Sequence, residues 1–283
     1  MKTLLLTPPL LQPNTPYAAT PILTAWLRFC GHDAVQADLS LELLLKLFSD
    51  DGLAQLCRAL KGNPDAAGFL APEKEYRAVI GEVMEFLQDR KPSAAKRLAK
   101  RGSFPEGPNL LRAYEQEEQF GWDFRGLDRH DRARYLCSLF LDDIAEAAAR
   151  LDPHFGFSRY AERLAANLPM FGKLRDEFEN SVPQRSCFRQ WLEELTDAQI
   201  QKHNPQLVAI TVPFPGCLFG ALCIARRIKQ TRPEIRIVLG GGYPNTELRE
   251  LTDPAVFDYV DFITLDSGML PLLRIAEGAE PAK

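Results

Sequence analysis

Residues 207–245 contain two apolar runs separated by a helical pattern, and this stretch constrains the fold more than any other. The first run, LVAITVPFPG, ends in a turn rich in proline and glycine, and the second, IRIVLGGGYPN, breaks into three glycines. Continuous apolar runs are typical of strands buried on both faces, as in parallel sheets covered by helices. The stretch therefore predicts a strand–helix–strand crossover whose two strands end in loops at the ligand-binding carboxyl edge of an open α/β sheet.

The first 40 residues show the same alternation. Thr3–Thr7 has the pattern of a short buried strand, which two prolines end because proline has no N–H for the ladder. Thr20 is then expected to cap a helix that has Pro21 at its first position, and a second strand is expected at Ala34–Asp38. These residues predict the opening β–loop–α–β unit of a doubly wound fold.

From residue 41 to residue 204 the pattern is helical, with proline and glycine between the helices. No repeat of fixed period is present. The helices are expected at Leu41–Phe48, Leu53–Leu60, Glu73–Asp89, Ala94–Lys100, Leu110–Phe120, Arg129–Arg150, Ser158–Ala166, Phe171–Phe178 and Phe188–Gln199. This region is therefore expected to be one long helical insertion.

The alternation of strands and helices returns after residue 205. Strands are expected at Leu207–Val212, Ile235–Leu239 and Val260–Leu265, with helices at Leu218–Thr231, Asn245–Leu251 and Leu270–Ala276. Together with the two N-terminal strands, they predict an α/β, Rossmann-like fold with a five-stranded parallel sheet in the flavodoxin-like order 2-1-3-4-5. Residues 1–40 and 205–283 are expected to form the α/β domain, and residues 41–204 an all-helical insertion between strands 2 and 3.

Composition narrows the classes of function. The net charge of −4 gives no reason to expect a nucleic-acid partner, and no apolar run reaches the ~18 residues of a membrane span. Six cysteines without paired spacing are typical of reduced thiols, which predicts a cytoplasmic location. The four histidines have no metal-ligand spacing, and no Ser/His/Asp or Cys/His arrangement can be assembled, so neither a metal site nor a catalytic residue is expected.

Loops at the predicted carboxyl edge carry the candidate ligand residues. Three consecutive glycines at 240–242 either let the backbone approach a flat or phosphorylated ligand or make a tight strand-to-helix turn. Asp266 either accepts a ligand hydroxyl or caps the following helix. The sequence contains neither G-x-G-x-x-G nor GxxxxGK[ST], so the fingerprints of dinucleotide and nucleoside triphosphate sites are absent.

Five stretches carry a resemblance to a known family: PPLLQPNTPYAATPILTAWLR, DPHFGFSRYAERLA, VPFPGCLFGALCIARRIK, GGGYPNTELREL and VFDYVDFITLDSG. Through them the chain resembles, over essentially its whole length, the N-terminal cobalamin-binding-like domain of cobalamin-dependent radical S-adenosylmethionine proteins. The resemblance implies a Rossmann-like domain that holds cobalamin at the carboxyl edge of the sheet. The residues that it would place against the cofactor are Asn14, Tyr17, Thr211, Pro213, Phe214, Pro215, Gly240, Gly241, Gly242, Tyr243, Asp266, Ser267 and Gly268.

The resemblance also implies a partner that this chain does not contain. In the family, a downstream barrel domain binds a four-iron cluster through CxxxCxxC together with S-adenosylmethionine, and cobalamin often relays a methyl group. This chain has no CxxxCxxC, so the radical chemistry is expected only of the parent enzyme. Met269 stands where relatives usually carry an acidic residue, and family members commonly lack a cobalt-binding histidine.

Two other interpretations remain open from the sequence. In one, the domain is a degenerate Rossmann-like scaffold whose helical insertion binds a substrate or a protein partner. In the other, it is a flavodoxin-like mononucleotide binder without a recognisable phosphate loop.

Overall fold

The computed structural model describes residues 1–11, 17–120, 126–152 and 186–280. The chain divides into two compact units, which are described separately. Residues 1–43 and 158–283 form the sheet unit, and residues 44–157 form the helical unit. Asn14 and the helices predicted at Ser158–Ala166 and Phe171–Phe178 lie outside the described residues.

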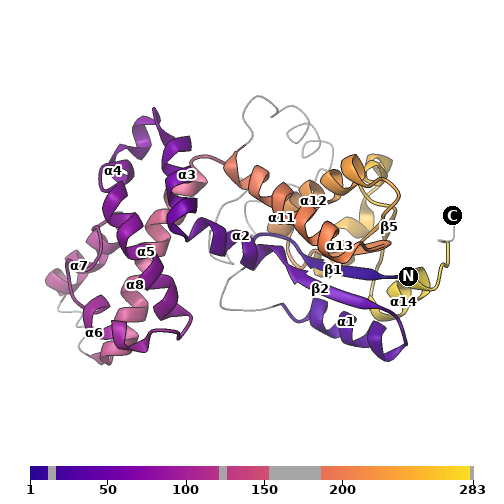
Figure 1. Cartoon of the computed structure of the whole chain (residues 1–283), viewed down its shortest axis with the longest axis horizontal. Coiled ribbons are helices and arrows are strands. Elements are labelled where there is room, and N and C mark those ends of the chain that lie inside the picture. The colour runs from indigo at the N-terminus through magenta and orange to yellow at the C-terminus, as the bar shows by residue number, and fades with distance from the viewer. Residues whose placement is uncertain (12–16, 121–125, 153–185, 281–283) are drawn as a thin grey trace. The chain divides into compact units, whose positions relative to one another are not determined.

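Five parallel strands form the centre of the sheet unit in the order β2-β1-β3-β4-β5, which confirms the predicted topology (Figure 1). The central strands β1 and β3 are buried at every residue, as continuous apolar runs predict. The register of β3 and β4 brings the carboxyl ends of both strands to the same level of the sheet. The strands are β1 (Thr3–Thr7), β2 (Ala34–Asp38), β3 (Leu207–Thr211), β4 (Arg236–Gly240) and β5 (Phe262–Ile263).

The last strand is shorter than the predicted Val260–Leu265. β5 contains only two residues and lies at the edge of the sheet, paired with β4 alone. Single hydrogen bonds to β4 carbonyls from the N–H groups of Asp261 (2.9 Å) and Thr264 (2.8 Å) flank it. Because an edge strand has one neighbour, pairing ends where the chain turns away from β4.

Helices cover both faces of the sheet. On one face, α1 (Ala19–Phe29) and α14 (Met269–Ala276) pack against strand residues in a common apolar core. Figure 1 shows α11 (Cys187–His203) and α12 (Leu218–Thr231) on the other face. An ion pair between Arg227 of α12 and Asp197 of α11 links these two helices. α11 therefore belongs to the sheet unit, although its sequence pattern continues that of the insertion.

The start of α1 differs from the sequence prediction. Thr20 does not cap the helix, because Ala18 is the N-cap residue and Thr20 lies within the first turn. Its hydroxyl lies 3.0 Å from the Thr7 hydroxyl in a buried hydrogen bond that links the helix to the end of β1. Pro21 is still in the first turn, where a missing N–H leaves no intrahelical bond unmade.

The chain leaves β4 directly into a helix. The predicted helix at Asn245–Leu251 starts earlier, as α13 (Gly242–Thr246), and a separate 3₁₀ turn follows at Leu248–Glu250. Gly241 makes the early start possible with a φ of +118°, a conformation that only glycine adopts readily.

The helical unit contains the remaining predicted helices. One aromatic stack marks its core, with the rings of Tyr76 and Phe140 5.2 Å apart. Side-chain caps fix two helix starts, because Ser49 accepts from the Gly52 N–H (3.0 Å) and Asp128 accepts from the His130 N–H (2.7 Å). The longer helices are α2 (Leu39–Leu47, which spans the boundary between the units), α3 (Asp50–Leu60), α5 (Glu73–Leu87), α7 (Pro108–Phe120) and α8 (Arg129–Ala149), and the short ones are α4 (Ala67–Leu70) and α6 (Ala95–Leu98).

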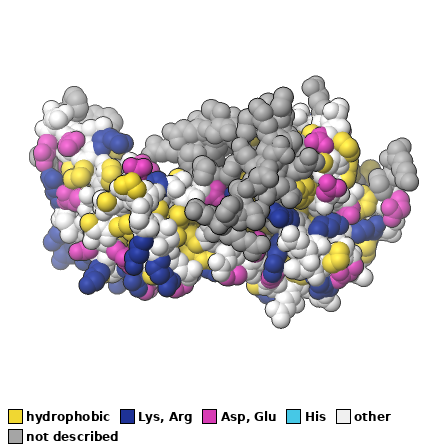
Figure 2. Space-filling model, turned by 90° about the horizontal axis from the view of Figure 1, so that it is seen from above, with side chains coloured by type: hydrophobic (Ala, Val, Ile, Leu, Met, Phe, Trp, Pro, Cys, Tyr) yellow, Lys and Arg dark blue, Asp and Glu magenta, His cyan; other side chains and the backbone are white. Residues whose placement is uncertain are grey.

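Charged side chains of both signs are mixed on the visible face of the helical unit (Figure 2). Arg132 of α8 pairs with Glu117 of α7 at 3.0 Å, and the partly exposed Arg77 of α5 pairs with Asp50 of α3 at 2.7 Å. These ion pairs link neighbouring helices of the unit. Among the described residues, no helix has the length and apolarity that crossing a membrane requires.

Candidate functional site

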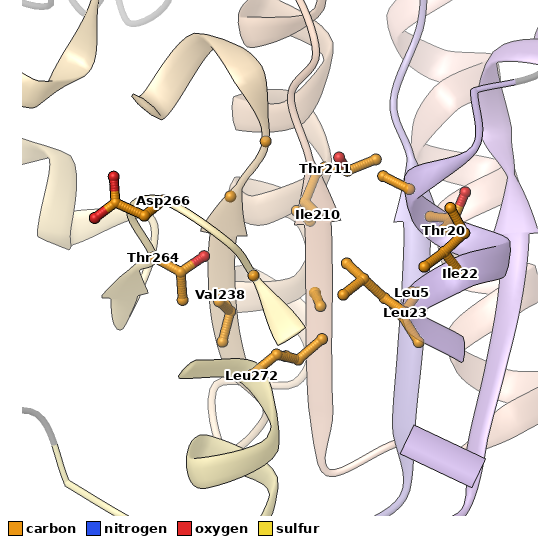
Figure 3. A pocket seen from close by; sticks show the side chains of 15 residues that line it. Leu5, Thr20, Ile22, Leu23, Ile210, Thr211, Val238, Thr264, Asp266 and Leu272 are labelled. Atoms are coloured by element: carbon orange, nitrogen blue, oxygen red, sulfur yellow. The ribbon is translucent and has the colours of Figure 1, made fainter. Parts of the chain in front are cut away.

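A cavity of about 210 Å³ opens in the sheet unit beside the carboxyl ends of β1, β3 and β4 and the loop after β5. It lies on the face of the sheet that α1 and α14 cover, with walls from the strands, the start of α1 and the start of α14 (Figure 3). Parallel α/β sheets hold ligands at this edge. The cavity is therefore the candidate functional site of the described residues.

Apolar side chains form the inner wall of the cavity. Leu5, Ala209 and Val238 come from three adjacent strands, and Leu23 and Leu272 come from the two covering helices (Figure 3). The middle strand contributes only a methyl group at position 209, between two larger side chains. This small residue leaves unfilled volume under the helices, because larger core side chains normally close such gaps.

Polar groups lie at the outer end of the cavity. The hydroxyl of Thr264 donates to a β4 carbonyl (3.4 Å), whereas that of Thr211 has no partner among the described residues. The backbone N–H groups of Gly241 and Gly242 also have no hydrogen-bond acceptor in the described part of the chain. A ligand with an apolar body and a hydrogen-bond acceptor at one end matches this distribution.

The glycines after β4 are required by backbone packing. A Cβ on Gly241 would lie 2.6 Å from the Val212 oxygen, and one on Gly240 would lie 2.5 Å from the Thr264 hydroxyl. Val212 is held in turn, because its N–H donates to the Gly240 carbonyl (2.6 Å) and its carbonyl accepts from the Tyr243 N–H (3.0 Å). The tight-turn interpretation of these glycines is thus sufficient to explain them.

Asp266 lines the mouth of the cavity and does not cap α14. The N-cap residue of α14 is Gly268, which has no side chain to accept a hydrogen bond, so the capping interpretation is wrong. The Asp266 carboxylate is largely exposed and forms an ion pair with Arg249. Its backbone φ of +60° is left-handed, which Asp tolerates better than most residues.

Tyr17, Phe214 and Pro215 lie outside the cavity lining. The rings of Tyr17 and Phe214 meet edge to face with centroids 6.2 Å apart, which joins the loops after β1 and β3. Burial, and then the nearby Cys217, raise the pKa of Tyr17, so the phenol is neutral at physiological pH. Cys217 is buried, and its thiol lies 3.6 Å from the Leu10 carbonyl.

The other predicted site residues divide between buried and exposed positions. Pro213 and Tyr243 are buried, and burial followed by a nearby glutamate raises the pKa of Tyr243. Ser267 is exposed, and Gly242 is partly buried next to the cavity-lining Gly241. Of the predicted residues, Thr211, Gly240, Gly241, Asp266 and Gly268 line the cavity.

Sequence reasoning missed the half of the site that comes from α1 and α14. Thr20 was assigned only to a helix cap, and Leu23 and Leu272 were assigned only to helices. The available signal was Ala209, a small residue in an otherwise bulky central strand. Asn245, which hydrogen-bonds the backbone of Asp266, carried no local signal because its partner is 21 residues away.

Comparisons with protein-family models, with curated proteins and with solved structures found no match to this chain. Among the described residues, no group of three or more His, Cys, Asp and Glu side chains is arranged to hold a metal ion. The candidate site is therefore characterised by its own geometry: an apolar cavity with a small polar mouth.

Proposed function

We propose that the sheet unit is a cofactor-carrying module that binds cobalamin at the carboxyl edge of its sheet. The observation that carries the proposal is the cavity at this edge, which the carboxyl ends of β3 and β4, the loop after β5 and the start of α1 build together. The resemblance to the cobalamin-binding-like domain supplies the identity of the ligand. A separate radical S-adenosylmethionine domain as the catalytic partner belongs to the same proposal.

The volume of the cavity determines which part of the cofactor can enter it. Its volume of about 210 Å³ exceeds the ~150 Å³ of an engineered apolar cavity that binds benzene, and it is below the ~300 Å³ at which drug-sized pockets begin. One aromatic base fits such a space, and a corrin macrocycle does not. The apolar walls suit the benzimidazole of cobalamin, and the corrin would then lie outside the cavity.

The chain's own residues would have binding and positioning roles only. Leu5, Ala209 and Val238 exclude water from the inner wall, and the Thr211 hydroxyl and the Gly241 N–H are donors at the outer end. When bound, cobalamin supplies methyl-transfer chemistry that protein side chains lack. No described histidine lies in the cavity lining, so these side chains offer no imidazole to cobalt.

Gly268 gives the sharpest test of the proposal. Its φ of −68° suits any residue, and a Cβ there would meet only the Leu23 methyl groups at 3.8 Å, an ordinary contact. Gly268→Leu therefore places an isobutyl group in the cavity without backbone strain. Gly81→Leu in α5 is the matched control, because a Cβ at that helical position meets nothing within 4 Å.

Equilibrium dialysis against hydroxocobalamin, read by corrin absorbance, measures the binding. Wild type and Gly81→Leu are expected to retain cobalamin with equal affinity, and Gly268→Leu to bind at least about tenfold more weakly, which corresponds to ~1.4 kcal/mol. Absence of retention by wild type at high micromolar cobalamin would reject the proposal. Equal affinity of all three proteins would place the ligand elsewhere.

A second candidate function is a scaffold whose helical unit binds a substrate or protein partner. One observation favours it: backbone packing alone accounts for Gly240 and Gly241, so a ligand is not needed to explain the glycine loop. The helical unit also has its own apolar core, as an independent binding body requires. This candidate predicts that ligands alter the helical unit and leave the carboxyl edge unchanged.

A further inference from the structure

The side-chain amide of Asn245 holds the loop after β5 through the backbone N–H and carbonyl groups of Asp266. The Asn245 amide nitrogen donates to the Asp266 carbonyl (3.0 Å), and its amide oxygen accepts from the Asp266 N–H. The β4–β5 ladder ends at Thr264, whose N–H donates to the Leu239 carbonyl (2.8 Å). Beyond that residue, the side-chain amide of Asn245 replaces the backbone neighbour that β4 no longer supplies.

Arg249 closes this arrangement into a ring. Its Nε donates to the Asn245 carbonyl (3.2 Å), and its guanidinium pairs with the Asp266 carboxylate. The segment after β4 is thereby joined to the loop after β5 through three side chains. Both segments line the cavity, through Gly240 and Gly241 on one side and Asp266 and Gly268 on the other.

The left-handed backbone at Asp266 needs such support. A residue with a side chain at φ +60° is strained relative to its ordinary conformations, and the polar side chain of Asp relieves only part of this strain. Two hydrogen bonds from one amide offset this strain. Without them, the loop is expected to relax away from the mouth of the cavity.

We propose that Asn245 is the positioning residue of the candidate site: it fixes the Asp266–Gly268 loop at the mouth of the cavity, and ligand affinity depends on it. The inference rests on the proposed function, because the affinity concerned is that for cobalamin. Asn245 itself is absent from the cavity lining and acts through Asp266.

Trp26 provides a readout of the loop that needs no ligand. Its indole N–H donates to the carbonyl of Met269 (3.1 Å), three residues after Asp266. In protein labelled with 5-fluorotryptophan, Trp26 gives one of three ¹⁹F resonances, which a Trp26→Phe variant assigns. Movement of the loop shifts this resonance, whereas a change of global stability alone does not.

The test compares Asn245→Leu with Asn63→Leu, a control that removes an Asn side-chain cap in the helical unit. We expect Asn245→Leu to shift the Trp26 resonance and to weaken hydroxocobalamin binding about tenfold, from the loss of two hydrogen bonds. Asp266→Gly added to Asn245→Leu removes the left-handed strain and is expected to restore part of both signals. Asn63→Leu is expected to change neither.

The outcomes separate this inference from the proposed function. An unshifted Trp26 resonance in Asn245→Leu would overturn the positioning role, and so would a lowered melting temperature with unchanged affinity. If wild type binds no cobalamin, the proposed function fails. The resonance then decides the positioning role by itself.

Discussion

The packing of Gly241 against Val212 predicts that Gly241→Ala greatly lowers the free energy of unfolding, for two separate reasons. The backbone at this position, with φ +118° and ψ −172°, is in a region that only glycine occupies freely, at a cost of about 1–3 kcal/mol for other residues. The new Cβ would also lie 2.6–2.8 Å from three backbone atoms of Val212. Forced overpacking adds typically about 1–3 kcal/mol. The total expected loss is therefore roughly 2–6 kcal/mol.

Two glycines in the same unit separate these contributions. Gly31→Ala has a comparable positive φ of +86° with nothing within 4 Å of the new Cβ, so only the conformational cost of about 1–2 kcal/mol remains. Gly240→Ala has no positive-φ cost and meets the Thr264 hydroxyl at 2.5 Å, which a side-chain rotation relieves in part. Gly241→Ala should exceed both.

Native-state hydrogen exchange of β3 and β4 amides measures the opening free energy of the sheet unit alone, which matters because the chain has two units. Wild type and the three variants are compared under identical conditions. If Gly241→Ala loses no more than Gly31→Ala, the close contact with Val212 does not exist. The account of the glycine loop would then be wrong.

Two further predictions concern buried groups of the helical unit. Burial raises the pKa of Asp143, one of whose oxygens has no partner among the described residues, so the folded protein holds this proton more tightly than the unfolded chain. The free energy of unfolding therefore falls as pH rises through the folded-state pKa. Asp143→Asn should remove this pH dependence and stabilise the unit at pH 7 by roughly 1 kcal/mol. Urea unfolding at several pH values measures both effects. Burial raises the pKa of Cys57 to about 11 and of Cys137 to about 12. In native protein at pH 8, iodoacetamide should therefore modify the partly exposed Cys30 well before either of these thiols. Peptide mass spectrometry measures the rate at each cysteine. Labelling of Cys137 as fast as Cys30 would contradict its burial.

The sequence predicts the sheet because its strands are local apolar runs. Five strands alternating with helices predicted the flavodoxin-like order 2-1-3-4-5, and the structure confirms it. The ends of the edge strand were predicted less well. β5 was expected to be six residues long and has two, because a strand at the edge of a sheet pairs with only one neighbour.

The candidate site was only partly predictable, since its walls come from segments distant in sequence. The ends of β3 and β4 and the loop after β5 were identified, because glycine, threonine and aspartate at strand ends are local signals. The apolar wall from Leu23 and Leu272, and the contact of Asn245 with Asp266, depend on tertiary packing. Thr20 illustrates the same limit: a local rule made it a helix cap, and a buried hydrogen bond to Thr7 gave it another position.

Hydrogen–deuterium exchange with and without saturating hydroxocobalamin tests most directly whether the carboxyl edge is the ligand site. Cobalamin bound at this edge is expected to slow exchange in the loops at 211–217, 240–246 and 264–268, including the Gly241 and Gly242 amides that have no acceptor among the described residues. No change is expected in α5, α7 and α8 of the helical unit. Protection confined to those helices, with the three loops unchanged, would contradict binding at the carboxyl edge and favour the scaffold function.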